Sequence, residues 1–360
     1  MKDLGRRPKR RRRSVRFCRT NHWVAQTSEP GDPNLHVFSF PITASERVRT
    51  VENLMTPSEV RAEALRFGVR SNWGRWGDDD ERGTLNLITA ENVTRAVATV
   101  RSGTVISLGQ PLDVEAPPYY PQGLDHAIKH EMITAWGSNA GGDVQAASDQ
   151  VHVQCHGLDN THMDAICHIG YGGVGYNGRK FTDMVDDTGA SACDILLSGP
   201  VVTRGVLVDV PRLRGVEFLP GGDPVTEEDL RRAAPDLAPG DALIIRTGRA
   251  LAGDDGRSFT EKYGRLAGLH HNAMKVVSEL DVGLLGMDGS ADNFPAVDEN
   301  RLPIHVLSLV HLGVHLLHNL SLEELAGALA ERGTSEFMLI AAPLRLPRGT
   351  GSPIAPVAVV

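Results

Sequence analysis

The most informative stretch of this chain is Cys155-His-Gly-Leu-Asp-Asn-Thr-His-Met-Asp-Ala-Ile-Cys-His168. It places four side chains that can bind a divalent metal within thirteen residues: His156, His162, Asp164 and His168. Imidazole and carboxylate are the usual ligands of zinc and manganese, and a catalytic site leaves one position open for water. A single histidine is more often packed or solvated, but four ligand-type residues this close together indicate a metal-dependent hydrolytic site.

The spacing predicts how these side chains converge. His162 and Asp164 are two residues apart, so an extended backbone places both on the same face. His168 follows Asp164 by four residues, which one helical turn or a tight loop returns to the site. We therefore expect His162 and Asp164 to bind the ion. His168, with the near-neutral pKa of an ordinary histidine, would move protons.

The pattern HGxxxTHxDAxxH, from His156 to His168, resembles the signature of the cyclase family of metal-dependent hydrolases. This family includes bacterial kynurenine formamidase, isatin hydrolase and one type of dienelactone hydrolase. The resemblance implies an α/β chain with a swivelling β/β/α layered fold and a curved, barrel-like mixed sheet. It continues in order through blocks typical of the longer, actinobacterial-type members: Trp73–Leu87, Gly172–Gly178, Gly268–His271, Pro303–His305 and Ala342–Pro353.

The resemblance carries metal-ligand roles onto His162 and Asp164 and the acid/base role onto His168. In the formamidase branch the first ligand histidine stands four residues before the second, where this chain has Leu158. The role of first ligand therefore falls on His156, six residues before His162.

Family members can also hold a second ion with the shared aspartate, a later histidine and a glutamate. In this chain the later histidine is His305, and His318 occupies the position of the glutamate. Histidine can bind metal, yet it lacks the negative charge of glutamate, so the sequence does not decide whether one ion or two are bound.

Several side chains are candidates for the substrate site. Trp73, Trp76 and Phe294, with Tyr119 and Tyr120, could form walls around a cyclic or aromatic substrate, and packing in the core is the alternative. His270, in the block Gly268–His271, is a further candidate.

We expect hydrolysis of an amide, cyclic amide or lactone bond by metal-activated water, with zinc as the ion and manganese as the alternative. The chain has no GxSxG nucleophile elbow and no GxxxxGK phosphate loop. Kynurenine formamidase activity is not the function that we favour, because this chain is longer than that branch of the family and differs from its pattern at Leu158 and His318. The alternatives are a polyketide-type cyclase or dehydratase and a non-catalytic small-molecule binder.

Composition predicts a soluble, cytoplasmic protein. The 360 residues, 41% of them hydrophobic, can bury a large core, and no apolar run is long enough to cross a bilayer. The four cysteines have no CxxC spacing, which suits a reducing compartment better than a disulfide framework. Cys155 and Cys167 are either soft metal ligands or, as we prefer, small residues that line the site.

Charge is distributed unevenly along the chain. Residues 1–20 hold ten Lys or Arg and one Asp, so the other 340 residues carry the net charge of −17 that brings the chain to −8. An acidic body argues against a nucleic-acid partner. We expect residues 1–54 to be a disordered basic extension and residues 55–360 to form one domain. A small-molecule substrate is the expected partner, and the resemblance implies a homodimer or homotetramer.

Local patterns predict alternating strands and helices after residue 55. Thr56, Pro57 and Glu59 indicate a capped helix start, and Ser321 with Glu324 indicates a second capping box. The Gly-rich stretch 170–178 predicts a tight turn that shapes the pocket. Strands are expected at 201–210, 242–247, 282–287 and 337–341, and helices at 226–234, 271–280 and from 321 to near 333.

Overall fold

The computed structural model describes residues 54–114, 128–139, 144–158, 160–233, 236–252, 265–294 and 302–360. The chain divides into two units, Met1–Thr50 and Val51–Val360, and every element below belongs to the second. The predicted extension 1–54 lies outside the described residues except for Leu54.

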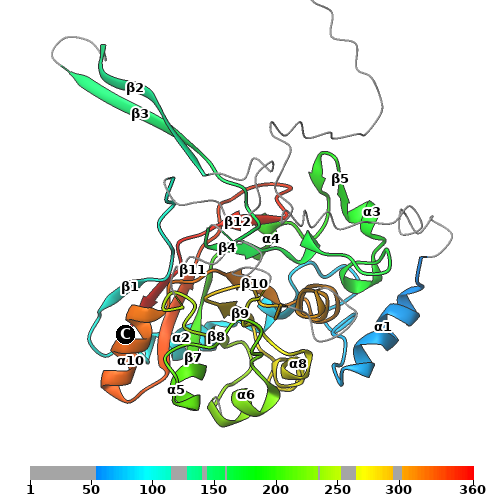
Figure 1. Cartoon of the computed structure of the whole chain (residues 1–360). Helices are drawn as coiled ribbons and strands as arrows, with labels where there is room; N and C mark the ends of the chain where they lie inside the picture. Colours follow the sequence, from blue (N-terminus) through cyan, green and yellow to red (C-terminus); the bar gives the residue numbers. More distant parts are fainter. Residues whose placement is uncertain are drawn as a thin grey trace, which may run out of the picture. The chain divides into compact units, whose positions relative to one another are not determined.

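A curved, nine-stranded mixed sheet is the centre of the fold (Figure 1). Its strand order is β1-β13-β11-β7-β8-β9-β10-β4-β12. The four strands β7 to β10 are parallel to one another, and the strands on both sides of them pair antiparallel. The expected α/β fold with a curved mixed sheet is confirmed. In order along the chain, the strands are β1 (Val105–Ser107), β4 (His162–Asp164), β7 (Val201–Asp209), β8 (Ala242–Arg246), β9 (Leu284–Met287), β10 (His315–His318), β11 (Glu336–Ala341), β12 (Gly351–Pro353) and β13 (Val357–Val359).

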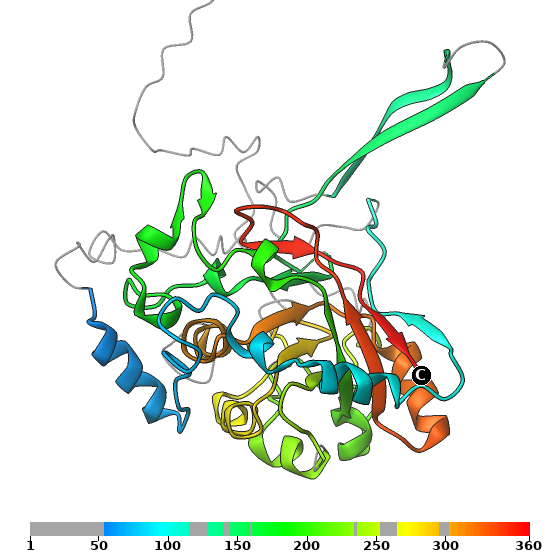
Figure 2. The same ribbon diagram turned by 180° about the vertical axis from the view of Figure 1, so that it is seen from behind.

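Helices pack on both faces of this sheet (Figures 1 and 2). Successive residues of a buried strand point to opposite faces, and on β7 Val206 and Val208 join one core cluster while Leu207 joins the other. The longer helices are α1 (Pro57–Arg66), α2 (Ala90–Val97), α6 (Glu227–Ala233), α8 (Met274–Glu279) and α10 (Glu323–Arg332). The short ones are α3 (Phe181–Met184), α4 (Ile195–Ser198), α5 (Val210–Arg214) and α9 (Pro303–His305). Among the described residues no helix has both the length and the hydrophobicity to cross a bilayer.

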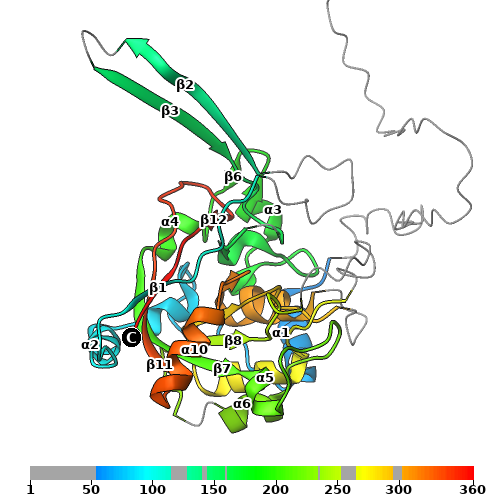
Figure 3. The same cartoon turned by 60° about the vertical axis from the view of Figure 1, so that its left-hand side comes forward.

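Two small antiparallel pairs lie outside the main sheet. Strands β2 (Lys129–Asn139) and β3 (Gln145–His152) form a ribbon (Figure 3). Every residue of β3 is solvent-exposed. Strands β5 (Val185–Asp186) and β6 (Gly189–Ala190) form the other pair. The ribbon leads along the chain into the segment that carries His156.

The capping predictions have different outcomes at the two helix starts. At α1 the Glu59 N–H donates to the Thr56 hydroxyl and the Thr56 N–H donates to the Glu59 carboxylate, so the predicted capping box is confirmed. At α10 it is wrong: the helix starts one residue after Leu322, and no side chain caps it. The acidic residues Glu323 and Glu324 lie in its first turn instead, where the helix dipole favours them. The helix ends at Gly333 in a left-handed conformation, as expected.

The other predicted elements are present with small changes of extent. The helix expected at 271–280 begins as a 3₁₀ turn, His271–Ala273, before α8, and the strand expected from Val282 begins at Leu284. The glycine-rich stretch forms the predicted tight turn, in which Tyr171 and Val174 pair across Gly172 and Gly173, both with positive φ. Further 3₁₀ turns are Gly83–Leu87, Ile166–His168 and Tyr176–Gly178.

Helix α9 continues as a π-helical segment, Val306–Leu312, which buries His311 completely. The His311 ring stacks on Trp73, with ring centroids 6.0 Å apart, and the Trp73 indole N–H donates to the Val310 carbonyl. Neither ring nitrogen of His311 has a hydrogen-bond partner within the described structure. Burial therefore lowers the pKa of His311 to about 4, so the ring is neutral at pH 7.

This buried imidazole predicts an acid-sensitive core. Because the unfolded chain binds a proton at His311 near pH 6.5 and the folded chain only near pH 4, stability is unaffected above pH 6.5 and falls as the pH decreases from there. His311→Phe keeps the stacking and removes the titration. The free energy of unfolding of wild type should fall by about 3 kcal/mol relative to this variant between pH 7 and pH 4, measured by urea denaturation. A difference that stays constant with pH would contradict this account.

Candidate metal centre

Strand β4 carries His162 and Asp164 inside the sheet, between β10 and β12. The backbone is extended there, so both side chains point to one face, as the spacing predicts. The register places His318 directly opposite His162 and Gly351 opposite Asp164. Directly opposed residues on antiparallel strands lie on the same face, so strand pairing brings His318 next to the other two.

Asp164 is the centre of the cluster and is completely buried. Its Oδ1 lies 2.8 Å from His156 Nδ1 and 3.6 Å from His162 Nε2. Its Oδ2 lies 3.0 Å from His318 Nε2 and 3.6 Å from His305 Nε2. The four histidines that the sequence proposes as metal ligands therefore surround the fifth proposed ligand, the Asp164 carboxylate.

His168 returns to the site through the 3₁₀ turn Ile166–His168, the tight turn that the spacing predicts. Its ring lies parallel to the His156 ring, with centroids 3.6 Å apart. Two groups of side chains have ligand atoms within 4.8 Å of one another: His156, His162 and Asp164 form one, and Asp164, His168 and His305 form the other. The groups share Asp164, so His168 has the position of a ligand as well as that of a proton carrier.

Two buried atoms of the cluster have no hydrogen-bond partner in the described structure: Asp164 Oδ2 and His318 Nε2. A buried carboxylate oxygen without a partner costs about 1–3 kcal/mol or more, because water is lost and nothing replaces it. A cation bound beside it removes that cost. The donor set of imidazoles and one carboxylate therefore fits a divalent ion of the zinc or manganese type.

Hydrogen bonds fix the orientation of two rings and the tautomer of one of them. His162 Nδ1 lies 3.0 Å from the Asn160 carbonyl, which can only accept, so Nδ1 carries the proton and Nε2 keeps its lone pair. His305 Nδ1 donates to the Asp292 carboxylate in the same way, which leaves His305 Nε2 facing Asp164. His162 thus presents an unprotonated Nε2, as metal-binding histidines do. His305 turns its Nε2 toward Asp164, but because the pKa of this ring is raised to about 10, Nε2 must lose a proton before it can bind a metal.

The other two predicted ligand rings are engaged differently. His156 Nδ1 donates to Asp164, and His156 Nε2 lies 3.0 Å from the Thr350 hydroxyl, so both nitrogens already have partners. His318 Nδ1 accepts the backbone N–H of Ala291 at 3.3 Å. His318 Nε2 lies 3.0 Å from Asp164 Oδ2 without hydrogen-bond geometry, and to bind a metal through Nε2 the neutral ring would need its proton on Nδ1, which ends the bond from Ala291. The ligand roles of His156 and His318 stay predictions, because each ring must give up a bond to take them.

Burial and mutual charge set the protonation of the cluster. Burial lowers the pKa of His162 to about 4 and that of His168 to about 3, although Asp164 opposes both shifts. The near-neutral pKa expected for His168 is therefore wrong for the buried ring. Burial disfavours the charged forms of Asp164 and His305 as well. The imidazoles around Asp164 nevertheless hold its pKa well below the usual value, and Asp292 raises the pKa of His305 to about 10.

The three described cysteines are free thiols. Burial raises the pKa of Cys155 to about 11 and those of Cys167 and Cys193 to about 12. The thiolate is the form that binds metal, and these groups stay protonated at neutral pH. This favours the interpretation of Cys155 and Cys167 as small residues that line the site.

The four predicted substrate-binding residues contact parts of the protein outside the histidine cluster. Trp73 packs on His311, Trp76 lies under the Arg75 guanidinium, His270 accepts the Asn272 N–H, and Phe294 pairs with Leu266 through its backbone. Within the described residues, none of these side chains makes a hydrogen bond, ion pair or ring contact with the histidine cluster. Their substrate roles remain predictions. Tyr119 and Tyr120 lie outside the described residues.

Sequence reasoning did not identify the residues that orient the rings. Asp292 also accepts the Ile304 N–H, so it joins the loop after β9 to the start of α9. An acidic residue shortly after a buried parallel strand was a usable signal for Asp292, because functional groups gather at the carboxyl ends of such strands. Asn160 acts through its carbonyl and Thr350 comes from a distant segment, so no residue pattern marks either one.

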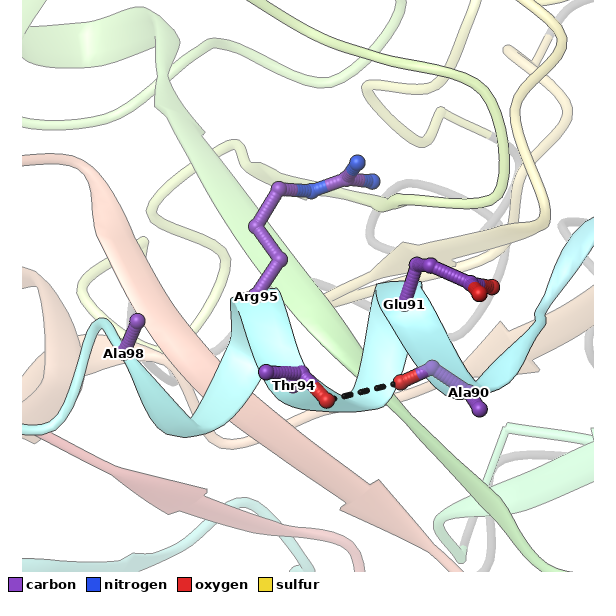
Figure 4. A pocket seen from close by; sticks show the side chains of 5 residues that line it. All are labelled: Ala90, Glu91, Thr94, Arg95 and Ala98. Carbon is purple, nitrogen blue, oxygen red and sulfur yellow. Dashed lines mark hydrogen bonds between the residues drawn. The ribbon is translucent and has the colours of Figure 1, made fainter.

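A surface pocket of another kind lies along α2 (Figure 4). Its polar side chains are already engaged: Thr94 donates to the Ala90 carbonyl, and the Arg95 guanidinium donates to Asp241. It shares no residue with the histidine cluster and contains no histidine or cysteine. We therefore assign no chemistry to this pocket, which is lined by Ala90, Glu91, Thr94, Arg95 and Ala98.

A family model described as "Putative cyclase" matches residues 106–292, just over half of the chain. The crystal structure of a novel cyclase is 30% identical, with a TM-score of 0.72, over 81% of this chain and 99% of that one. The chain belongs to the Cyclase family. The Cyclase match includes the stretch from His156 to His168, whereas His305 and His318 lie beyond it.

A second structure shows the same fold at lower identity. Isatin hydrolase A from Labrenzia aggregata, bound to benzyl benzoate, is 19% identical with a TM-score of 0.50, over 75% of this chain and 98% of that one. No curated protein matches the chain significantly. At this identity the isatin hydrolase shares the Cyclase fold, and the similarity assigns no substrate.

Gly351 gives a direct test of the place of His156. A Cβ at this position would lie 2.6 Å from His156 Cε1 and 2.8 Å from the Met163 carbonyl. Gly351→Ala should therefore displace the His156 ring and weaken Zn²⁺ binding about tenfold or more, measured by competition with a chelator. Gly327→Ala is the control, because a Cβ there meets nothing within 4 Å in the middle of α10. It should stabilise the fold by about 0.5–1 kcal/mol and leave Zn²⁺ affinity unchanged. Equal Zn²⁺ affinity in both variants would contradict a ligand role for His156.

Proposed function

We propose that this chain is a metal-dependent hydrolase that cleaves an amide, cyclic amide or lactone bond in a small cyclic or aromatic substrate. One observation carries the proposal: imidazoles from separate segments converge on Asp164, whose buried Oδ2 has no hydrogen-bond partner among the described residues. Zinc is the expected ion and manganese the alternative. One structure with the same fold is an isatin hydrolase, which supports hydrolysis as the reaction class.

The proposed roles follow the geometry. His156, His162 and Asp164 hold the ion, with His305 or His318 completing the set. A divalent ion in such a site makes water nucleophilic at neutral pH and polarises the carbonyl that is attacked. His168 is neutral at pH 7 and takes a proton from the attacking water. The protonated ring then passes the proton to the leaving nitrogen or oxygen.

The first experiment combines metal analysis with a substrate panel. The full chain is purified, its zinc and manganese content is measured, and it is incubated with N-formyl arylamines, cyclic imides and lactones. The proposal expects about one or two equivalents of metal per chain and release of a carboxylic acid, with ¹⁸O from labelled water in the product. A cyclised or dehydrated product without ¹⁸O would instead indicate a cyclase. Protein that binds no stoichiometric metal would indicate a binding protein.

The role of His168 has its own test. His168→Ala should lower kcat at least about 100-fold if this ring transfers the proton. His130→Ala is the control: its ring pairs with Asp149 on the exposed ribbon, so activity should not change. If His168→Ala loses its metal and excess Zn²⁺ restores kcat, the ring is a ligand, as its place beside Asp164 and His305 also allows.

The quaternary structure is a separate proposal. We expect a homodimer or homotetramer, on the basis of the family resemblance, and light scattering of the purified chain measures it.

A further inference from the structure

Asn319 follows His318 directly at the end of β10 and is completely buried. Its φ is 55°, in the left-handed region that costs a non-glycine residue energy. Its side-chain Nδ2 donates to two carbonyls, Gly157 and Asn160, each at 2.9 Å. Its own carbonyl accepts the Thr161 hydroxyl at 2.7 Å. One residue thus binds the loop between His156 and His162 at three points.

Both side-chain bonds reach atoms next to the cluster. Gly157 is the residue after His156. The Asn160 carbonyl is the same acceptor that holds His162 Nδ1 at 3.0 Å. A carbonyl oxygen has two lone pairs, so Asn160 can accept from both groups at once. The amide of Asn319 therefore fixes the oxygen that sets the tautomer of His162.

Arg249 fixes the direction of this amide. Its Nη1 donates to Asn319 Oδ1 at 2.7 Å, so the oxygen faces the guanidinium and the nitrogen faces the loop. The backbone around Arg249 is itself held by the buried Asp288 carboxylate, which accepts the N–H groups of Thr247, Gly248 and Arg249. The ends of β8, β9 and β10 are linked in this way to the loop that precedes β4.

We propose that Asn319, oriented by Arg249, is a positioning residue that sets metal affinity. It holds the His156 and His162 segments together and keeps the lone pair of His162 Nε2 directed at the ion. This inference rests on the proposed metal-binding function. Partners that orient a metal-binding histidine commonly contribute a factor of 10–100 to metal affinity.

The test compares Zn²⁺ affinity in variants of the full chain by competition with a chelator. Asn319→Asp keeps the size and the acceptor for Arg249 but places an oxygen against two carbonyl oxygens. Asn319→Gly accepts the left-handed backbone without strain and removes all side-chain bonds. We expect Zn²⁺ affinity to fall about 10–100-fold in both variants. A similar loss of Zn²⁺ affinity in both variants would show that misfolding of one variant does not cause it.

Asn177 provides a matched control. It also has a left-handed φ, 59°, and its Nδ2 also donates to backbone carbonyls, the nearest being Gly77 at 3.1 Å. None of its bonds reaches the cluster. Asn177→Asp should lower thermal stability without changing Zn²⁺ affinity more than about twofold. An equal loss of affinity in this variant would assign the effect to general destabilisation and overturn the inference.

A second readout needs no metal. In ¹⁵N NMR of the metal-free chain, His162 should be one tautomer with Nδ1 protonated in wild type and a mixture in Asn319→Gly. An unchanged tautomer together with unchanged Zn²⁺ affinity would overturn the inference alone. Wild-type protein that binds no Zn²⁺ would overturn the proposed function, and the metal part of this inference with it.

Discussion

A carboxylate with no access to water is the constraint on which the site depends. Asp164 is completely buried, and an isolated charge there would be costly in a medium of low dielectric. Imidazoles from four separate segments surround it and hold its pKa low. The cluster is therefore one electrostatic unit, because loss of one ring leaves the buried charge less well neutralised.

Strand pairing delivers most of this unit. Strand β4 is three residues long and lies between β10 and β12. Its register on both neighbours determines which side chains of the three strands share a face of the sheet. A slip by one residue would place Met163 on the side where His162 and Asp164 now lie. Gly351 on β12 leaves room for the His156 ring, which a Cβ would approach within 2.6 Å. Core packing on both faces of the sheet fixes this register and thereby the positions of His162 and Asp164.

The sequence predicted the parts of the site that are local in the chain. The two-residue spacing of His162 and Asp164 on an extended strand and the turn back to His168 follow from short-range geometry. The orienting contacts of Asp292, Asn319 and Thr350 depend on segments that meet only after folding. The capping box expected at α10 failed for a related reason, since Ser321 is tied by its backbone to Leu108 of a distant segment.

The presence of histidine at position 318 has an electrostatic consequence for catalysis. Among the described residues, Asp164 is the carboxylate that lies within 4 Å of four rings, and the charge of His305 is matched by Asp292. In the proposed site, a divalent ion held by Asp164 and imidazoles would keep a net positive charge. A glutamate at position 318 would cancel it. Retained positive charge stabilises the negative charge that develops on a carbonyl oxygen under attack, which is the largest contribution in many hydrolases. In the proposed hydrolase, histidine at this position would therefore favour electrostatic catalysis by a single ion and would disfavour binding of a second one.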